Sequence, residues 1–154
     1  MTIETAWESP GFLLWHATLR WQRAVTAALR PYDLTHVQFV LLASVWWLGR
    51  EKREPNQLEL SQHTGADVKM VSQVLRKLES SSLIERNTDR VDTRMKRLRV
   101  TPIGVELVDK ARFAVEDADA AYFAAVEDQE LLMVMLSALS GRAGGSRTRR
   151  AGAG

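Results

Sequence analysis

Apolar residues recur every three or four positions through most of the chain, which is the spacing of amphipathic helices. Ser9 and Pro10 mark one helix start, because serine caps free N–H groups and proline at the first helical position gives up no hydrogen bond. This helix is predicted to end at about residue 30, before Pro31. A second helix is predicted from Thr35, where Gln38 completes a capping box, to about residue 49.

Two further predicted helices are short and close together. The first follows Asn56 and ends near Gly65, and the second follows Asp67 with apolar residues at helical spacing from Val68 to Leu78. The opposite face of the second helix is polar and basic, with Lys69, Ser72, Gln73 and Arg76. Two helices joined by a tight glycine-containing turn, with a polar face on the second, are typical of a helix-turn-helix.

A β-hairpin is predicted directly after this pair. Residues 83–86 and 96–101 are its strands, and in the second strand Leu98 and Val100 alternate with arginines. The segment between the strands is polar and charged, as in the wing of a winged helix-turn-helix.

Two more helices are predicted after the hairpin, from Pro102 to about residue 126 and over residues 130–139. The first of them is acidic and rich in alanine. The expected fold is therefore mainly α with a small β-hairpin wing, in which a winged helix-turn-helix lobe is joined to a helical lobe.

The composition limits the class of protein. The chain has 154 residues, 45% of them apolar, which is enough for the core of one globular domain. It contains no cysteine, which excludes disulfides, thiolate zinc sites and thiol redox sensing. Its longest apolar runs are shorter than the roughly 20 residues of a membrane span, and its first residues lack a signal-peptide pattern. We expect a cytoplasmic protein that does not enter a membrane.

Charge is segregated along the chain, although the formal net charge is only +2. Residues 67–101 carry a net charge of +4, whereas residues 102–140 carry −6. A polyanion is therefore expected to bind the predicted helix-turn-helix and hairpin. Residues 141–154 add four arginines and no acid, and they are predicted to form a flexible basic tail. The tail either keeps the protein soluble or adds nonspecific phosphate contacts, and its sequence fits both roles.

The sequence carries no pattern of a catalytic, metal or cofactor site. His16, His36 and His63 lie on three different predicted helices, without acidic partners at metal-ligand spacing. No serine lies in a recognisable nucleophile turn, and there is no glycine-rich phosphate loop. The sequence therefore predicts no enzyme activity, no metal and no cofactor.

Three strings identify a resemblance that covers about three quarters of the chain. They are LTHVQFVLLASV at residues 34–45, LSQHTGADVKMVSQVLRKLES at residues 60–80 and LIERNTDRVDTRMKRLRVTPIGVEL at residues 83–107. In this order they resemble the second helix, the helix-turn-helix and the wing of the MarR family of bacterial transcriptional regulators. The third string is the most specific, because its spacing of Asp89, Asp92 and Arg94 is not a helical periodicity.

The resemblance implies a DNA-binding regulator, in most cases a repressor, that binds a palindromic operator as a homodimer. Residues 1–140 would form one MarR-like domain, with dimerisation helices at about 9–30 and 102–140 and the winged helix-turn-helix at about 35–101. The helix after Asp67 would enter the major groove of double-stranded DNA.

The same resemblance implies residue roles in the wing. Arg94 would enter the minor groove, and Asp92 would orient it. Ser82 stands where the family usually has glycine, at a helix exit that favours left-handed backbone. The expected DNA contacts are Lys69, Ser72, Gln73, Arg76, Arg90, Asp92, Arg94 and Arg97.

An effector site is also expected from the resemblance, between the helical and DNA-binding lobes, for a small aromatic or anionic compound. Its candidate residues are Trp15, His16, Arg20, Phe39 and Trp46. Aromatic residues at helical spacing are more often part of a core, so both interpretations stay open. Two other functions also stay open, namely a DNA-binding regulator without an effector and a winged-helix module that binds protein.

Overall fold

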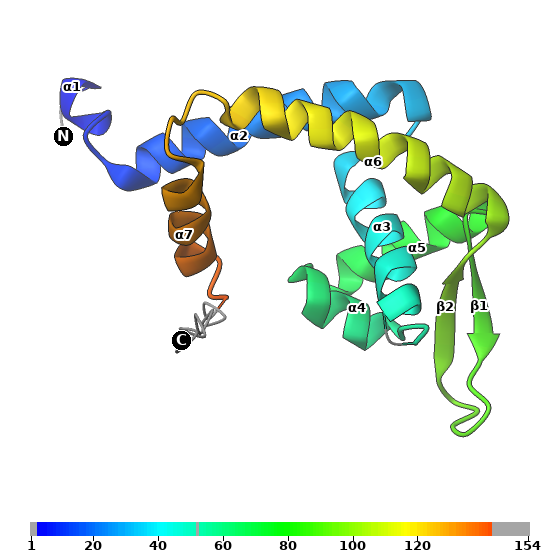
Figure 1. Ribbon diagram of the computed structural model, residues 1–154. Coiled ribbons are helices and arrows are strands. Elements are labelled where there is room, and N and C mark those ends of the chain that lie inside the picture. The colour runs from blue at the N-terminus through cyan, green and yellow to red at the C-terminus, as the bar shows by residue number, and fades with distance from the viewer. Residues whose placement is uncertain (1–2, 52, 143–154) are drawn as a thin grey trace, which may run out of the picture. The chain divides into compact units, whose positions relative to one another are not determined.

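The computed structural model describes residues 3–51 and 53–142, and Figure 1 shows its elements. It consists of helices and one two-stranded antiparallel sheet. In chain order the elements are α1 Ile3–Ala6, α2 Pro10–Leu29, a 3-10 turn Arg30–Tyr32, α3 His36–Glu51, α4 Gln57–Thr64, α5 Val68–Ser80, β1 Ile84–Thr88, β2 Lys96–Val100, α6 Pro102–Phe123 and α7 Gln129–Leu139. They fall into two compact units, Met1–Asp119 and Ala120–Gly154. The predicted basic tail lies outside the described residues from residue 143 onwards.

The helix starts are those predicted from the capping residues. Ser9 accepts a backbone N–H at the start of α2, and Asn56 and Asp67 do the same at α4 and α5. The capping box of α3 forms in both directions, since Thr35 N donates to Gln38 Oε1 at 3.0 Å and Gln38 N donates to Thr35 Oγ1 at 3.2 Å. The short helix α1 was not predicted.

The exit of α5 explains why β1 begins later than predicted. Ser82 has a left-handed backbone with φ 59°, as the resemblance implies for this position. The N–H of Leu83 donates to Leu78 O at 2.9 Å and that of Ser82 donates to Glu79 O at 3.0 Å, which is a Schellman motif. Because its N–H is used in this motif, Leu83 bonds the opposite strand only through its carbonyl oxygen, and β1 begins at Ile84.

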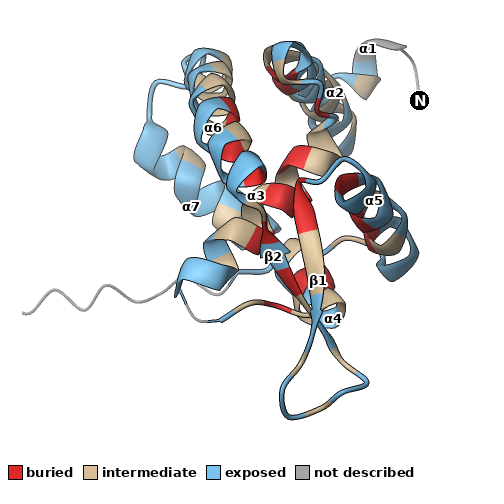
Figure 2. Cartoon of the chain, turned by 90° about the vertical axis from the view of Figure 1, so that its right-hand side faces the viewer, coloured by how far each residue is buried: buried red, intermediate tan, exposed pale blue. Residues whose placement is uncertain are grey.

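The core of the larger unit gathers around α3. Figure 2 shows buried residues on the facing sides of α2, α3, α5, α6 and the hairpin. The residues that form the hydrophobic core among them are aliphatic except for one ring. They are Val25, Leu29, Leu34, Phe39, Leu41, Leu42, Val45, Leu60, Val71, Leu75, Leu78, Leu83, Ile84, Leu98, Val100, Val108 and Ala111. No helix in the described part of the chain is both long enough and apolar enough to cross a membrane.

The hairpin is held at its base by the core and by the segment before α4. Its register pairs Ile84 with Val100 and Thr88 with Lys96. Leu98 and Val100 are buried, as predicted from their alternation with arginines. The N–H of Leu98 also donates to Pro55 O at 2.8 Å, which ties β2 to the start of the helix-turn-helix.

Gly104 lies where the first turn of α6 crosses the α5 exit. A Cβ atom at this position would overlap the carbonyl oxygen of Leu83 and lie 2.6 Å from Cγ1 of Val100. Thr101 joins the same elements, since its hydroxyl donates to Ser82 O at 2.7 Å and its N–H donates to Leu83 O at 3.0 Å. The absence of a side chain at residue 104 therefore allows α6 to approach the winged domain closely.

We expect Gly104→Ala to lower the free energy of unfolding by about 1 to 3 kcal/mol, because the backbone carbonyl in its way cannot move aside at low cost. Gly49→Ala is the matched control, since a Cβ at this helical position meets nothing within 4 Å and alanine favours a helix. Urea denaturation of both variants measures the difference. Equal stability of the two variants would show that the close approach is unimportant.

Candidate nucleic-acid interface

The turn between α4 and α5 sets the geometry of the helix-turn-helix. Gly65 ends α4 with φ 72°, a left-handed backbone that favours glycine. The buried Ser61 donates from its hydroxyl to Ala66 O at 2.7 Å, which satisfies a carbonyl inside the turn. Asp67 then caps α5 by accepting from the N–H groups of Lys69 and Met70. The turn thus starts α5 directly after α4.

The outer face of α5 carries the residues predicted to contact DNA. Lys69, Gln73 and Arg76 are exposed, and Ser72 is half-buried. This face lies opposite the buried stripe of Val71, Leu75 and Leu78. The same helix therefore presents amide, hydroxyl and cationic groups together on its outer side, which is the combination that reads base edges and phosphates.

Two apolar residues of α5 also lie on the exposed side. Val68 was predicted to belong to the apolar stripe, but its exposed fraction is 49%, and Met70 is 38% exposed. The prediction from periodicity was therefore wrong for Val68, which lies outside the buried stripe of Val71, Leu75 and Leu78. Apolar side chains beside polar ones suit contact with a thymine methyl group.

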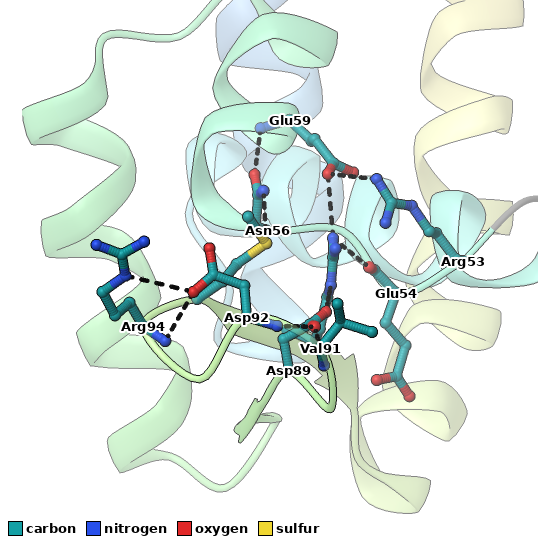
Figure 3. Close-up of polar contacts among 10 residues, drawn as sticks. Arg53, Glu54, Asn56, Glu59, Asp89, Val91, Asp92 and Arg94 are labelled. Carbon is teal, nitrogen blue, oxygen red and sulfur yellow. Dashed lines mark hydrogen bonds and ion pairs between the residues drawn. The ribbon is translucent and has the colours of Figure 1, made fainter.

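The wing presents Arg94 to solvent. Its side chain is 92% exposed, and its Nε lies 3.5 Å from Oδ1 of Asp92. The same carboxylate oxygen accepts the N–H of Arg94 at 3.1 Å (Figure 3). Arg90 is also exposed. The structure thus brings Asp92 and Arg94 together as the resemblance implies, while their part in DNA binding stays a prediction.

Arg97 lies at the wing base and differs from the other wing arginines. Its side chain is only 13% exposed, with Nε 2.7 Å from Oδ2 of Asp89 and Nη1 3.0 Å from Oε1 of Glu59. The backbone N–H of Asp92 and the guanidinium of Arg97 hold the pKa of Asp89 well below its usual range. The two carboxylates in turn raise the pKa of Arg97. Arg97 was predicted to contact DNA, but in the free protein its guanidinium is paired with protein carboxylates.

The residues predicted for an effector site do not converge on one cavity. Phe39 belongs to the core, and Trp46 is half-buried with the Arg50 guanidinium 4.8 Å from its ring centre. Trp15 and Arg20 are exposed. His16 is stacked on neighbouring rings, Trp7 at 4.6 Å and Phe12 at 4.5 Å between centroids.

A hollow of about 610 Å³ lies instead where the 3-10 turn and the start of α3 face the end of α5. Arg30, His36 and Lys77 supply cationic or titratable groups to its wall, and Asp33 supplies one acid. Leu34, Leu78, Leu83 and Leu107 give it apolar surface. Its cations come from segments far apart in the chain, so spacing along the sequence does not reveal this hollow.

His36 connects this hollow to the long helices. Its ring lies 5.0 Å from that of Trp21 in an edge-on arrangement, and Trp21 Nε1 donates to Asp119 Oδ1 at 2.7 Å. Burial lowers the pKa of His36, and the negative charge of Asp119 opposes this effect. In residues 3–51 and 53–142, no three His, Asp or Glu side chains are grouped so that they could hold a metal ion.

Known proteins share both the sequence and the fold. The family model of the ArnR1-like winged-helix domain matches residues 30–116. The HTH-type transcriptional regulator YdcH of Bacillus subtilis (strain 168) is 45% identical over 122 residues, which are 79% of this chain and 83% of that protein. A mutant MarR from E. coli complexed with operator DNA has a TM-score of 0.78 at 18% identity, and the match covers 93% of this chain and 100% of that one.

The chain belongs to the MarR family of winged-helix transcriptional regulators. This confirms the resemblance and the predicted fold class, and it makes the protein a DNA-binding regulator and not an enzyme. Another relative of the same fold is CouR from Rhodococcus jostii RHA1 bound to p-coumaroyl-CoA, with a TM-score of 0.77 at 24% identity, covering 90% of this chain and 96% of that one. CouR is described as a transcriptional repressor in its complex with a 23-mer DNA duplex.

The outer face of α5 predicts two kinds of DNA contact that mutation can separate. Ser72→Ala and Gln73→Ala should each weaken specific operator binding by about 1 to 3 kcal/mol and leave nonspecific binding nearly intact. Lys69→Ala and Arg76→Ala should weaken binding to all duplexes and reduce its salt dependence. Titrations on operator and random duplexes at several salt concentrations measure both effects. Equal losses on both duplexes for Ser72→Ala and Gln73→Ala would assign these residues to positioning rather than base reading.

Proposed function

We propose that this MarR-family regulator is a repressor that binds an inverted-repeat operator as a homodimer, with α5 in the major groove and Arg94 of the wing in the minor groove. The observation that carries the proposal is the outward polar face of α5 beside a wing whose Arg94 side chain is 92% exposed. Arginine suits a narrow minor groove because it combines charge with weaker hydration than lysine. The DNA complexes of MarR and of the repressor CouR, which share this fold, support the same function here.

Exposed apolar side chains in each of the two units support a second copy of the chain. In the larger unit, Leu14 and Trp15 of α2 are more than half exposed. In the smaller unit, α7 leaves Leu131, Met133, Val134, Met135 and Leu139 more than half exposed. Apolar surface of this extent is typical of an interface, and a second copy of the chain would remove it from water.

A twofold dimer reads two half-sites of opposite orientation, so selection of bound fragments from random duplex DNA should yield an inverted repeat. Its half-site centres should lie about one helical turn apart, at about 34 to 36 Å. Light scattering at the concentrations that bind DNA should give the mass of a dimer. A monomer in solution together with a single unrepeated binding site would contradict the proposal.

The effector part of the proposal rests on the hollow beside the end of α5. Arg30 and Lys77 are placed to neutralise a carboxylate or phosphate, and the leucines of its wall suit an aromatic ring. Lys77 lies on α5, whereas Arg30 and His36 lie on the opposite side of the hollow. A ligand that bound both sides would shift the orientation of α5, provided that it favours one orientation over the other. The complex of CouR with p-coumaroyl-CoA supports an aromatic, anionic class of effector.

Arg30→Gln tests this site against the one predicted from sequence, for which Arg20→Gln is the matched control. With p-coumaroyl-CoA and simple hydroxycinnamates as probes, Arg30→Gln should raise the ligand concentration that half-releases operator DNA by about tenfold, the effect of losing one charged hydrogen bond. Arg20→Gln should respond as the wild type does. The opposite pattern would favour the predicted site. If no probe changes operator affinity, the regulator without an effector becomes the better interpretation.

A further inference from the structure

Glu59 is an acidic residue on the side of the protein that faces DNA in the proposed function. It belongs to the first turn of α4, and its backbone N–H donates to the capping Asn56 Oδ1 at 2.8 Å. The Glu59 side chain does not return to the helix start as in a capping box. It reaches the wing, where it accepts a bond from Arg97. Oε1 lies 3.0 Å from Arg97 Nη1 and 3.0 Å from Arg53 Nη2, with the side chain 34% exposed. A carboxylate here repels the phosphates of DNA, so its contribution to binding has to come from its contacts within the protein.

Arg97 connects Glu59 to the end of β1. Its guanidinium has Nη1 on Glu59 and Nε on Asp89, so one planar group bonds two carboxylates from different elements. Nη1 also lies 3.4 Å from the backbone oxygen of Glu54 in the segment before α4. Lysine could not replace this arrangement, because it has neither the planar fork nor the separate donors of arginine.

Asp89 extends the connection into the wing tip (Figure 3). Its Oδ1 accepts the backbone N–H groups of Val91 at 2.8 Å and Asp92 at 2.9 Å, which fixes the turn. Asp92 in turn holds the backbone N–H and the guanidinium of Arg94. A continuous series of polar contacts therefore runs from α4 through Arg97 to Arg94.

We propose that Glu59, Arg97 and Asp89 are positioning residues that orient the wing tip on α4 before DNA binds, so that Arg94 is presented to the minor groove without an ordering cost. A second and weaker contact also joins the start of α4 to the tip, since Asn56 Nδ2 lies 3.3 Å from Met95 Sδ, a poor acceptor. The backbone bonds from Asp89 N to Met95 O and from Met95 N to Asp92 O lie within the tip and do not tie it to α4. The bonds at the hairpin base, such as Leu98 N to Pro55 O, hold the strands but not the turn, and Val91 at the tip is 96% exposed. A wing released from α4 would lose rotational freedom on binding, which weakens affinity.

The proposal predicts the sign of a charge effect. Removing a negative charge from a DNA-facing surface should tighten binding if Coulomb repulsion is the only effect. We expect the opposite for Glu59→Ala, which keeps the backbone N–H that Asn56 caps. The loss should be about tenfold in operator affinity, which corresponds to about 1.4 kcal/mol and is typical of residues coupled through a polar network.

A double-mutant cycle with Arg94 separates an effect on the orientation of Arg94 from a general loss of structure. This test, like the inference, rests on the proposed role of Arg94 in DNA binding. In the Arg94→Ala background, Glu59→Ala should change operator affinity by less than about twofold, since no arginine remains to be oriented. Glu85→Ala is the matched control. Glu85 is an acid of the same hairpin that bonds Arg99 on the neighbouring strand, away from the series of contacts that leads to Arg94, so its removal should leave affinity unchanged or tighter.

Operator affinity by fluorescence anisotropy at fixed salt, with urea midpoints for every variant, decides between the outcomes. Unchanged or tighter binding by Glu59→Ala, or the same loss in both backgrounds, would overturn the inference alone. Wild-type binding by Arg94→Ala would overturn the proposed minor-groove contact and the inference with it. If Glu59→Ala does not fold, Arg97→Lys replaces it in the cycle and should show the same pattern, a loss that disappears in the Arg94→Ala background.

Discussion

The surface that this regulator offers to DNA depends on the burial of one side of α5. Val71, Leu75 and Leu78 are no more than 1% exposed and lie in the core with residues of α3. Burying one such aliphatic side chain contributes about 1.5 to 3 kcal/mol, so turning α5 about its axis would forfeit a large part of the stability of a small domain. The rotation of the helix, and with it the outward position of Gln73 and Arg76, is therefore set by hydrophobic burial before any DNA is present.

The wing is oriented by a different kind of interaction, because its tip adds no side chain to the hydrophobic core: Val91 is 96% exposed and Met95 is half-buried. Arg97 and Asp89 meet instead in a pair whose side chains are only 13% and 15% exposed. Shielding charges in this way costs desolvation energy unless they are hydrogen-bonded on several sides, and here Glu59 and two backbone N–H groups supply those bonds. Charged residues on the DNA-binding side of a protein can thus fix the conformation of that surface as well as set its electrostatic potential.

Local chemistry explains which expectations the structure confirmed. The helix starts at Ser9, Thr35, Asn56 and Asp67 were predictable because a cap needs only the next two or three residues. The burial of the residues predicted for an effector site was not predictable in the same way. Spacing placed Phe39 on an apolar face, but it carried no information about the elements that would cover this face and place the ring in the core.

The sequence by itself determined the order of the elements, the helix caps, the concentration of positive charge in residues 67–101 and the family. Each of these depends on residues a few positions apart or on a pattern shared with relatives. Only the tertiary structure decided that Arg97 pairs with Glu59, 38 positions earlier, rather than pointing to solvent like Arg94. Both are wing arginines in the sequence, and they differ because the start of β2, where Arg97 lies, packs near α4, whereas Arg94 lies in the turn before this strand.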